Sequence, residues 1–176
     1  MFQLIQRRGF IKKAVLGVAA LGFAGFANTK NARANSAAED AETQRRIDLA
    51  RKHMEVEALE ASTDKLFVET MGTLQQEPEY ILNGAPLSGH DTILKTYQGF
   101  FGPLENVKFV ERPNGMYVAK QAIIFEVSLT ADVKGKPAAK IDLPMFVAFV
   151  FDQVGGPIVG EHAYFDSATF ARQLGG

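Results

Sequence analysis

The chain of 176 residues contains no cysteine and no tryptophan, and its three histidines lie far apart, at His53, His90 and His162. Without cysteine there are no disulfides, no thiolate metal ligands and no cysteine nucleophile, so packing alone must stabilise the fold. The sequence also lacks a His-x-His pair, a glycine-rich phosphate loop and a Gly-x-Ser-x-Gly nucleophile elbow. We therefore expect neither a metal nor a cofactor.

Positive charge is concentrated at the start of the chain. The first 34 residues hold six of the 19 basic side chains and none of the 20 acidic ones. Residues 35–176 therefore carry 13 basic and 20 acidic side chains, a formal net charge of −7. An acidic domain is a poor partner for nucleic acid or for an anionic membrane surface.

The first 34 residues have the layout of a secretory leader. The basic segment Arg7–Lys13 precedes an apolar run, Ala14–Ala27, that is too short to span a bilayer, and Ala32–Ala34 has the small residues of a cleavage site. The paired arginines resemble the twin-arginine signal family, whose substrates cross the bacterial inner membrane already folded. The resemblance implies recognition by the twin-arginine export machinery, cleavage after Ala34 and a periplasmic or secreted protein. The alternative is that residues 11–27 stay in place as an uncleaved membrane anchor.

The remaining residues suit one domain that begins with helices. Residues 35–42 are small and acidic, as in a flexible spacer, and the domain is expected over 43–176. Apolar residues at three-to-four spacing predict a helix over about 43–60. A second helix is expected after the capping residues of segment 62–64, and a third after Ser88.

The second half of the domain has the pattern of strands. A short strand is expected at 80–82, and Asn114-Gly115 predicts a tight hairpin. The expected longer strands are 107–111, 116–120, 120–133, 141–152 and 158–165, followed by a short helix that starts at Asp166. Helices followed by an antiparallel meander indicate the α+β class.

Several local segments, in this order, resemble the SnoaL-like (polyketide cyclase-like) branch of the nuclear transport factor 2-like superfamily. The resemblance covers about His53 to Gly175, and its segments are His53–Glu57, Tyr80–Gly84, Gly89, Ile123–Glu126, Glu161–Asp166 and Gln173–Gly175. It implies a cone-shaped, strongly curved antiparallel sheet that wraps around the N-terminal helices and leaves a pocket at one end. It also implies a homodimer, because the open sheet face of this superfamily often pairs two subunits. The superfamily includes cyclases, isomerases, dehydratases and proteins that only bind, so the fold alone does not give the function.

Two candidate sites come from residues near the expected pocket. His53 and Glu57 lie four apart and share a helix face, where the carboxylate could make the imidazole a general base, or the pair could form a structural hydrogen bond. Glu126 alternates with apolar residues on a strand, so it either faces the pocket or points outward from a half-solvated sheet.

The last strand offers a third candidate site. Its alternation places His162, Tyr164 and Asp166 on one face and Glu161 on the other, and only one face can line a pocket. Resemblance to the cyclases favours Glu161 or Asp166 as the acid–base carboxylate, although Asp166 also stands where the last helix needs an N-cap. Tyr164 could donate a hydrogen bond to an enolate oxygen or simply pack.

Three functions remain open on this evidence. The first is an enzyme in which a carboxylate or histidine removes a proton next to a carbonyl group, for isomerisation, cyclisation or dehydration without a cofactor. Its expected catalytic residues are Glu161, Glu126, His53 and Asp166, and its expected substrate contacts are Tyr164, Glu57, Tyr80 and Phe149. The second function is the binding of a small apolar molecule in a phenylalanine-lined pocket, and the third is a dimerising scaffold.

Overall fold

The computed structural model describes the backbone of residues 28–63 and 65–175, and the side chains from residue 37 onward within those ranges. Its helices are α1 (Asn28–Ser62), α2 (Val68–Thr73), α3 (His90–Phe101) and α4 (Ser167–Gln173). Its strands are β1 (Leu74–Leu82), β2 (Ala85–Leu87), β3 (Leu104–Ala119), β4 (Ala122–Val133), β5 (Lys136–Val150) and β6 (Ile158–Phe165). The expected α+β class is confirmed.

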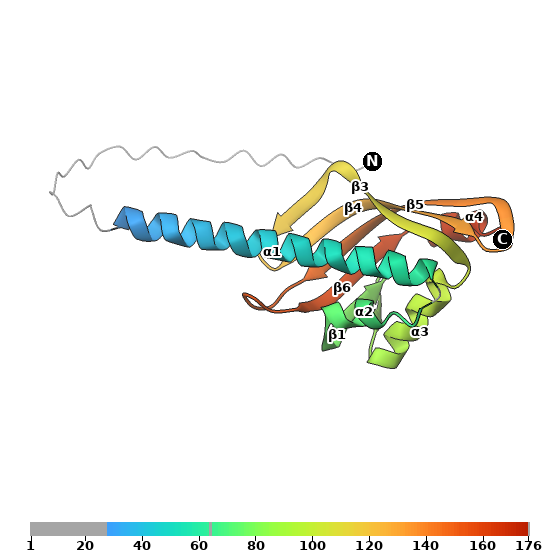
Figure 1. Ribbon diagram of the computed structural model, residues 1–176, viewed down its shortest axis with the longest axis horizontal. Coiled ribbons are helices and arrows are strands. Elements are labelled where there is room, and N and C mark those ends of the chain that lie inside the picture. The colour runs from blue at the N-terminus through green and yellow to red at the C-terminus, as the bar shows by residue number, and fades with distance from the viewer. Residues whose placement is uncertain (1–27, 64, 176) are drawn as a thin grey trace, which may run out of the picture.

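The six strands form one curved, open sheet in the order β2-β1-β6-β5-β4-β3, and α1 runs along one of its faces (Figure 1). The neighbours β3, β4, β5 and β6 pair antiparallel, whereas β1 pairs parallel with β6. The sheet is therefore mixed and not purely antiparallel as expected. The parallel pair arises because the chain crosses from β1 to the far edge of the sheet through α3 before it returns to β6.

The hairpin predicted at Asn114-Gly115 is wrong. Residues 104–119 form one long strand, β3, whose register against β4 shifts between Glu111 and Met116. Asn114 does have a positive φ, 59°, as a turn residue would. Here, however, that conformation belongs to a bulge in the strand, and the chain reverses only later, at Lys120-Gln121.

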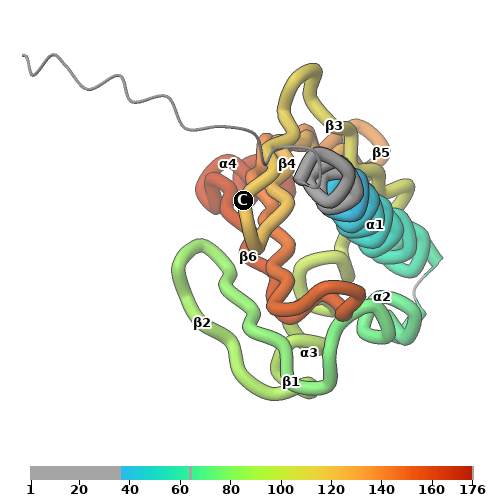
Figure 2. Tube along the Cα trace, turned by 90° about the vertical axis from the view of Figure 1, so that its left-hand side faces the viewer, coloured from blue at the N-terminus to red at the C-terminus, as the bar shows by residue number. Residues whose placement is uncertain are grey.

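Helix α1 supplies the layer that covers the concave side of the sheet. Ile47, Ala50 and Met54 on its inner face pack against alternate strand residues such as Phe125 and Phe149, all of them buried. Figure 2, which looks along α1, shows α2 and α3 beside its C-terminal end. These three helices and strands β1 and β6 therefore enclose one end of the core.

The predicted export signal lies mostly outside the described residues, and so does Asp64 of the predicted cap before the second helix. Helix α1 begins upstream of the expected start at Thr43, and its backbone includes residues 35–42 of the expected spacer. Among the described helices, none is both long and apolar enough to cross a membrane.

Candidate functional site

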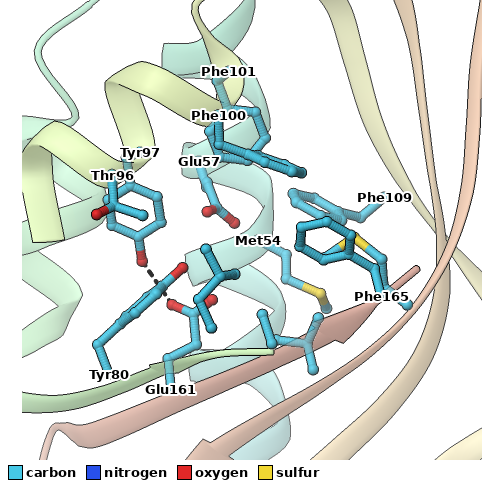
Figure 3. A pocket seen from close by; sticks show the side chains of 14 residues that line it. Met54, Glu57, Tyr80, Thr96, Tyr97, Phe100, Phe101, Phe109, Glu161 and Phe165 are labelled. Carbon is cyan, nitrogen blue, oxygen red and sulfur yellow. Dashed lines mark hydrogen bonds between the residues drawn. The ribbon is translucent and has the colours of Figure 1, made fainter. Parts of the chain in front are cut away.

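A small cavity, about 20 Å³ in volume, lies at the end of the core where α1, α3, β1 and β6 meet (Figure 3). Rings of six aromatic residues surround it, namely Tyr80, Tyr97, Phe100, Phe101, Phe109 and Phe165. The carboxyl groups of Glu57 and Glu161 face the same space. Among the described residues that line the cavity, none is lysine or arginine, so it combines apolar walls with two acidic groups.

The periodicities of α1 and β6 explain why these polar groups face inward. His53, Glu57 and Glu60 follow one another at intervals of four and three, so they share the buried face of α1. On β6, Glu161, Ala163 and Phe165 line the cavity, whereas His162 and Tyr164 lie on the opposite face of the sheet. This resolves the question that the sequence left open about the last strand.

Glu161 is the centre of a buried hydrogen-bond cluster. The Tyr97 hydroxyl donates to Glu161 Oε2 over 2.6 Å, as the dashed line in Figure 3 marks. His53 Nε2 lies 3.1 Å from the same oxygen and 3.4 Å from the Tyr97 hydroxyl. Three elements, α1, α3 and β6, therefore bring their polar atoms to one point.

The other side of the His53 ring is also held. Nδ1 lies 2.5 Å from the Thr73 hydroxyl, and the edge of the ring contacts Phe149 with 5.2 Å between ring centroids. Phe149, expected to contact a substrate, instead supports His53 from β5. It is the cross-strand partner of Glu161.

Glu57 differs from its neighbours because its carboxyl group has no hydrogen-bond partner among the described residues. Burial, together with the nearby Glu161 carboxylate, raises the pKa of Glu57 well above its ordinary value. Burial and the same carboxylate also raise the pKa values of Tyr80 and Tyr97. Tyr80 and Tyr97 therefore keep their protons at neutral pH, and the Glu57 carboxyl group holds its proton to a higher pH than an exposed glutamate does.

The same residues include a donor set of the kind that binds metals. His53 Nε2 and carboxylate oxygens of Glu57 and Glu161 all lie within 4.8 Å of one another, and these donor types suit a divalent cation. However, the Glu161 oxygen nearest to His53 already accepts the Tyr97 hydroxyl. A carboxylate that shares protons with a phenol and an imidazole suits acid–base chemistry better than ligation.

Three of the predicted site residues lie away from the cavity. Glu126 is on the outer face of the sheet, where it accepts a 2.6 Å hydrogen bond from Tyr117. Tyr164 is 43% exposed on the same face. Asp166 accepts a hydrogen bond from the amide of Ala168, so the predicted N-cap role is confirmed.

Sequence reasoning missed the roles of Tyr97 and Thr73. Neither residue is among the candidates named from the sequence. A tyrosine in the middle of an apolar stripe is itself a signal, because a buried phenol needs a hydrogen-bond partner. No comparable signal marks Thr73, since threonine is common at helix ends.

No family model and no curated protein matches the sequence. The fold does match solved structures. A protein from Shewanella putrefaciens, described as a SnoaL-like polyketide cyclase, is 14% identical, with a TM-score of 0.57 over 74% of this chain and 96% of its own. An NTF2-like protein from Anabaena variabilis is 14% identical, with a TM-score of 0.55 over 69% of this chain and 90% of its own.

A third neighbour is a protein with a ketosteroid isomerase-like fold from Catenulispora acidiphila, in complex with trimethylamine. It is 18% identical, with a TM-score of 0.54 over 70% of this chain and 92% of its own. At these identities the likeness establishes fold only. The chain has the nuclear transport factor 2-like fold that these SnoaL-like and ketosteroid isomerase-like structures share.

Proposed function

We propose that this protein catalyses proton transfer next to the carbonyl group of a small, mostly apolar compound, without a cofactor. The observation that carries the proposal is the buried cluster of Glu161, His53 and Tyr97 beside an unpartnered Glu57, whose pKa is raised by burial and by the Glu161 carboxylate. A base and an acid in one enclosed cavity are what enolisation requires.

The roles follow from the contacts. Glu161 accepts the Tyr97 hydroxyl on Oε2, beside His53 Nε2, and its carboxylate takes a proton from the carbon next to the carbonyl. As that C–H bond breaks, its electron pair moves toward the carbonyl oxygen, and the Glu57 carboxylic acid donates a hydrogen bond to the enolate. Return of the proton to another carbon gives isomerisation. Loss of a neighbouring hydroxyl as water gives dehydration, and attack of the enolate on a second carbonyl gives cyclisation.

Proton exchange tests this step without knowledge of the true substrate. A panel of cyclic enones and aryl ketones is incubated with the protein in D2O, and NMR follows loss of the α-proton signals. We expect exchange with the wild type, at least a tenfold loss in Glu161→Gln, and no loss in Glu126→Gln, the matched change on the outer face. Equal exchange in wild type and Glu161→Gln would reject the proposal.

A second candidate is the binding of a small alkylammonium ion without turnover. Glu57 lies unpartnered among aromatic rings, and an alkylammonium ion beside it would favour the ionised form of its carboxyl group, so that charge pairing and cation–π contacts hold the ion. The trimethylamine complex of the Catenulispora protein supports this candidate. If this candidate is right, calorimetric titration with trimethylamine shows binding to the wild type and none to Glu57→Gln. The NMR exchange assay with the ketone panel then shows no activity.

For the assembly, we propose a homodimer formed through the outer sheet face. Phe146 and Tyr164 are cross-strand partners on that face and are 52% and 43% exposed. Sedimentation velocity should give a dimer for the wild type and a monomer for Phe146→Asp. A wild-type monomer at every concentration tested would contradict it.

We also propose twin-arginine export, on the basis of the leader sequence. Changing Arg7 and Arg8 to lysine together should keep the protein in the cytoplasm, whereas the wild type should reach the periplasm. N-terminal sequencing of the exported protein should begin at Asn35. A protein that keeps its leader in the membrane fraction would instead be the anchored form.

A further inference from the structure

The short helix α2 and the residue before it contact both His53 and Tyr97, the two partners of Glu161. Thr73, its last residue, contacts His53, and Phe67, the residue before its first turn, stacks on Tyr97 with 5.4 Å between ring centroids. The six residues of α2 thus support the imidazole at one end and the phenol at the other.

Helix α2 is itself fixed to α1 by a buried carboxylate. Glu60, two turns after His53, accepts hydrogen bonds from the amides of Glu69 and Thr70 and from the Thr70 hydroxyl, at 2.8–3.0 Å. Burial alone would raise the pKa of Glu60, but these three hydrogen bonds outweigh it and lower the pKa. An ionised Glu60 therefore holds the first turn of α2 in place.

The hydroxyl of Thr73 has one proton, and the direction in which it points decides which ring nitrogen of His53 carries the hydrogen. Thr73 Oγ1 donates that proton to the Thr70 carbonyl over 2.7 Å. Toward His53 the oxygen can then only accept, so the Nδ1 atom at 2.5 Å must carry a hydrogen. In the neutral imidazole this leaves the lone pair on Nε2, which faces Glu161 and Tyr97.

We infer that Thr73 is a positioning residue: it fixes His53 with a hydrogen on Nδ1, so that Nε2 can accept the proton that Glu161 removes from the substrate. The inference rests on the proposed function for its chemical consequence, but the tautomer itself does not depend on turnover. In the relay the substrate C–H proton passes to Glu161, and from Glu161 to Nε2. With the opposite tautomer Nε2 would already carry a hydrogen and the relay would stop at Glu161.

NMR of protein labelled with ¹⁵N in histidine tests the inference directly, with His53→Gln identifying the signals of His53. We expect a protonated Nδ1 in the wild type and in Thr73→Ser, which keeps the hydroxyl. Thr73→Val, which has nearly the same shape but no hydroxyl, should lose this fixed pattern. A wild-type His53 with bare Nδ1 and protonated Nε2 would overturn the inference, even if every variant failed to fold.

The exchange assay gives the second readout. Thr73→Val should lower the exchange rate at least about tenfold and change its dependence on pH, while Thr73→Ser should stay within about twofold of the wild type. An unchanged NMR pattern and rate in folded Thr73→Val would also overturn the inference. Failure of the proposed function looks different, because exchange would then be absent in the wild type while the NMR pattern persists.

Discussion

Tyr97 on α3 donates a 2.6 Å hydrogen bond to Glu161 on β6, and both side chains are buried beside the cavity. The two residues are 64 positions apart in the chain, and their bond joins the helix layer to the sheet. The phenol holds the Glu161 carboxyl group in place beside the cavity, so this contact supports Glu161 as a base.

Replacing Tyr97 with phenylalanine should therefore impair the base more than the fold. We expect at least a tenfold lower exchange rate and a loss of about 1–2 kcal/mol in the free energy of unfolding. Tyr117→Phe is a matched control, because it removes a hydrogen bond of the same length to Glu126 on the outer face. The two variants should differ clearly in exchange rate, and equal rates would argue against a role for Tyr97.

Glu57→Gln should make stability less dependent on pH. Since burial raises the pKa of Glu57 in the folded state, the folded protein holds its proton above pH 4.5 more strongly than the unfolded chain does. The wild type then loses stability relative to the variant as the pH rises above 4.5, whereas below 4.5 the two should behave alike. Urea unfolding between pH 4 and pH 9 measures this, and parallel stability curves would contradict it.

Glu42 gives the opposite pH dependence at the other end of α1. Hydrogen bonds from the Arg45 side chain, then from Arg46 and the Gly155 amide, lower the pKa of Glu42 from 4.5 to about 2. The contribution of ionised Glu42 to the free energy of unfolding is fully present above pH 4.5 and is lost as the pH falls toward 2. Glu42→Gln should cost about 1 kcal/mol at pH 7 and much less at pH 2, whereas Glu39→Gln should change stability little at either pH.

Metal removal should have no effect if the His53–Glu161 pair works by sharing protons. We expect purified protein to contain no stoichiometric metal by mass spectrometry, and dialysis against EDTA to leave the melting temperature and exchange rate unchanged. Adding Zn²⁺ or Mn²⁺ should not raise the melting temperature. A rise that disappears in Glu57→Gln would instead identify the three ligand atoms as a metal site.

Local patterns in the sequence predicted most of the elements correctly. The three-to-four spacing around Ile47 and Met54 predicted the buried face of α1, whereas alternation left open which face of β4 points inward. The same alternation paired Glu161 with Ala163 on one face of β6, and the capping role of Asp166 was also readable. These features depend on neighbours within a few residues, which is why periodicity reveals them.

The Asn114-Gly115 pair shows where local reading fails. A positive φ at Asn114 suits both a hairpin turn and a bulge, and pairing with β4 decides between them. The parallel partner of β1 was equally hidden, because no local pattern records which strand a chain returns to.

The sequence by itself determined an α+β chain with a basic N-terminal segment, no thiol chemistry and a short set of acidic and histidine candidates. Only the tertiary structure decided which of them meet: Glu57 and Glu161 face one cavity and His53 lies beside Glu161, whereas Glu126 lies on the outer face of the sheet. It also added Tyr97 and Thr73, whose roles depend on hydrogen bonds to residues 64 and 20 positions away. Spacing fixes the direction of a side chain on its own helix or strand, but only packing of those elements fixes what it meets.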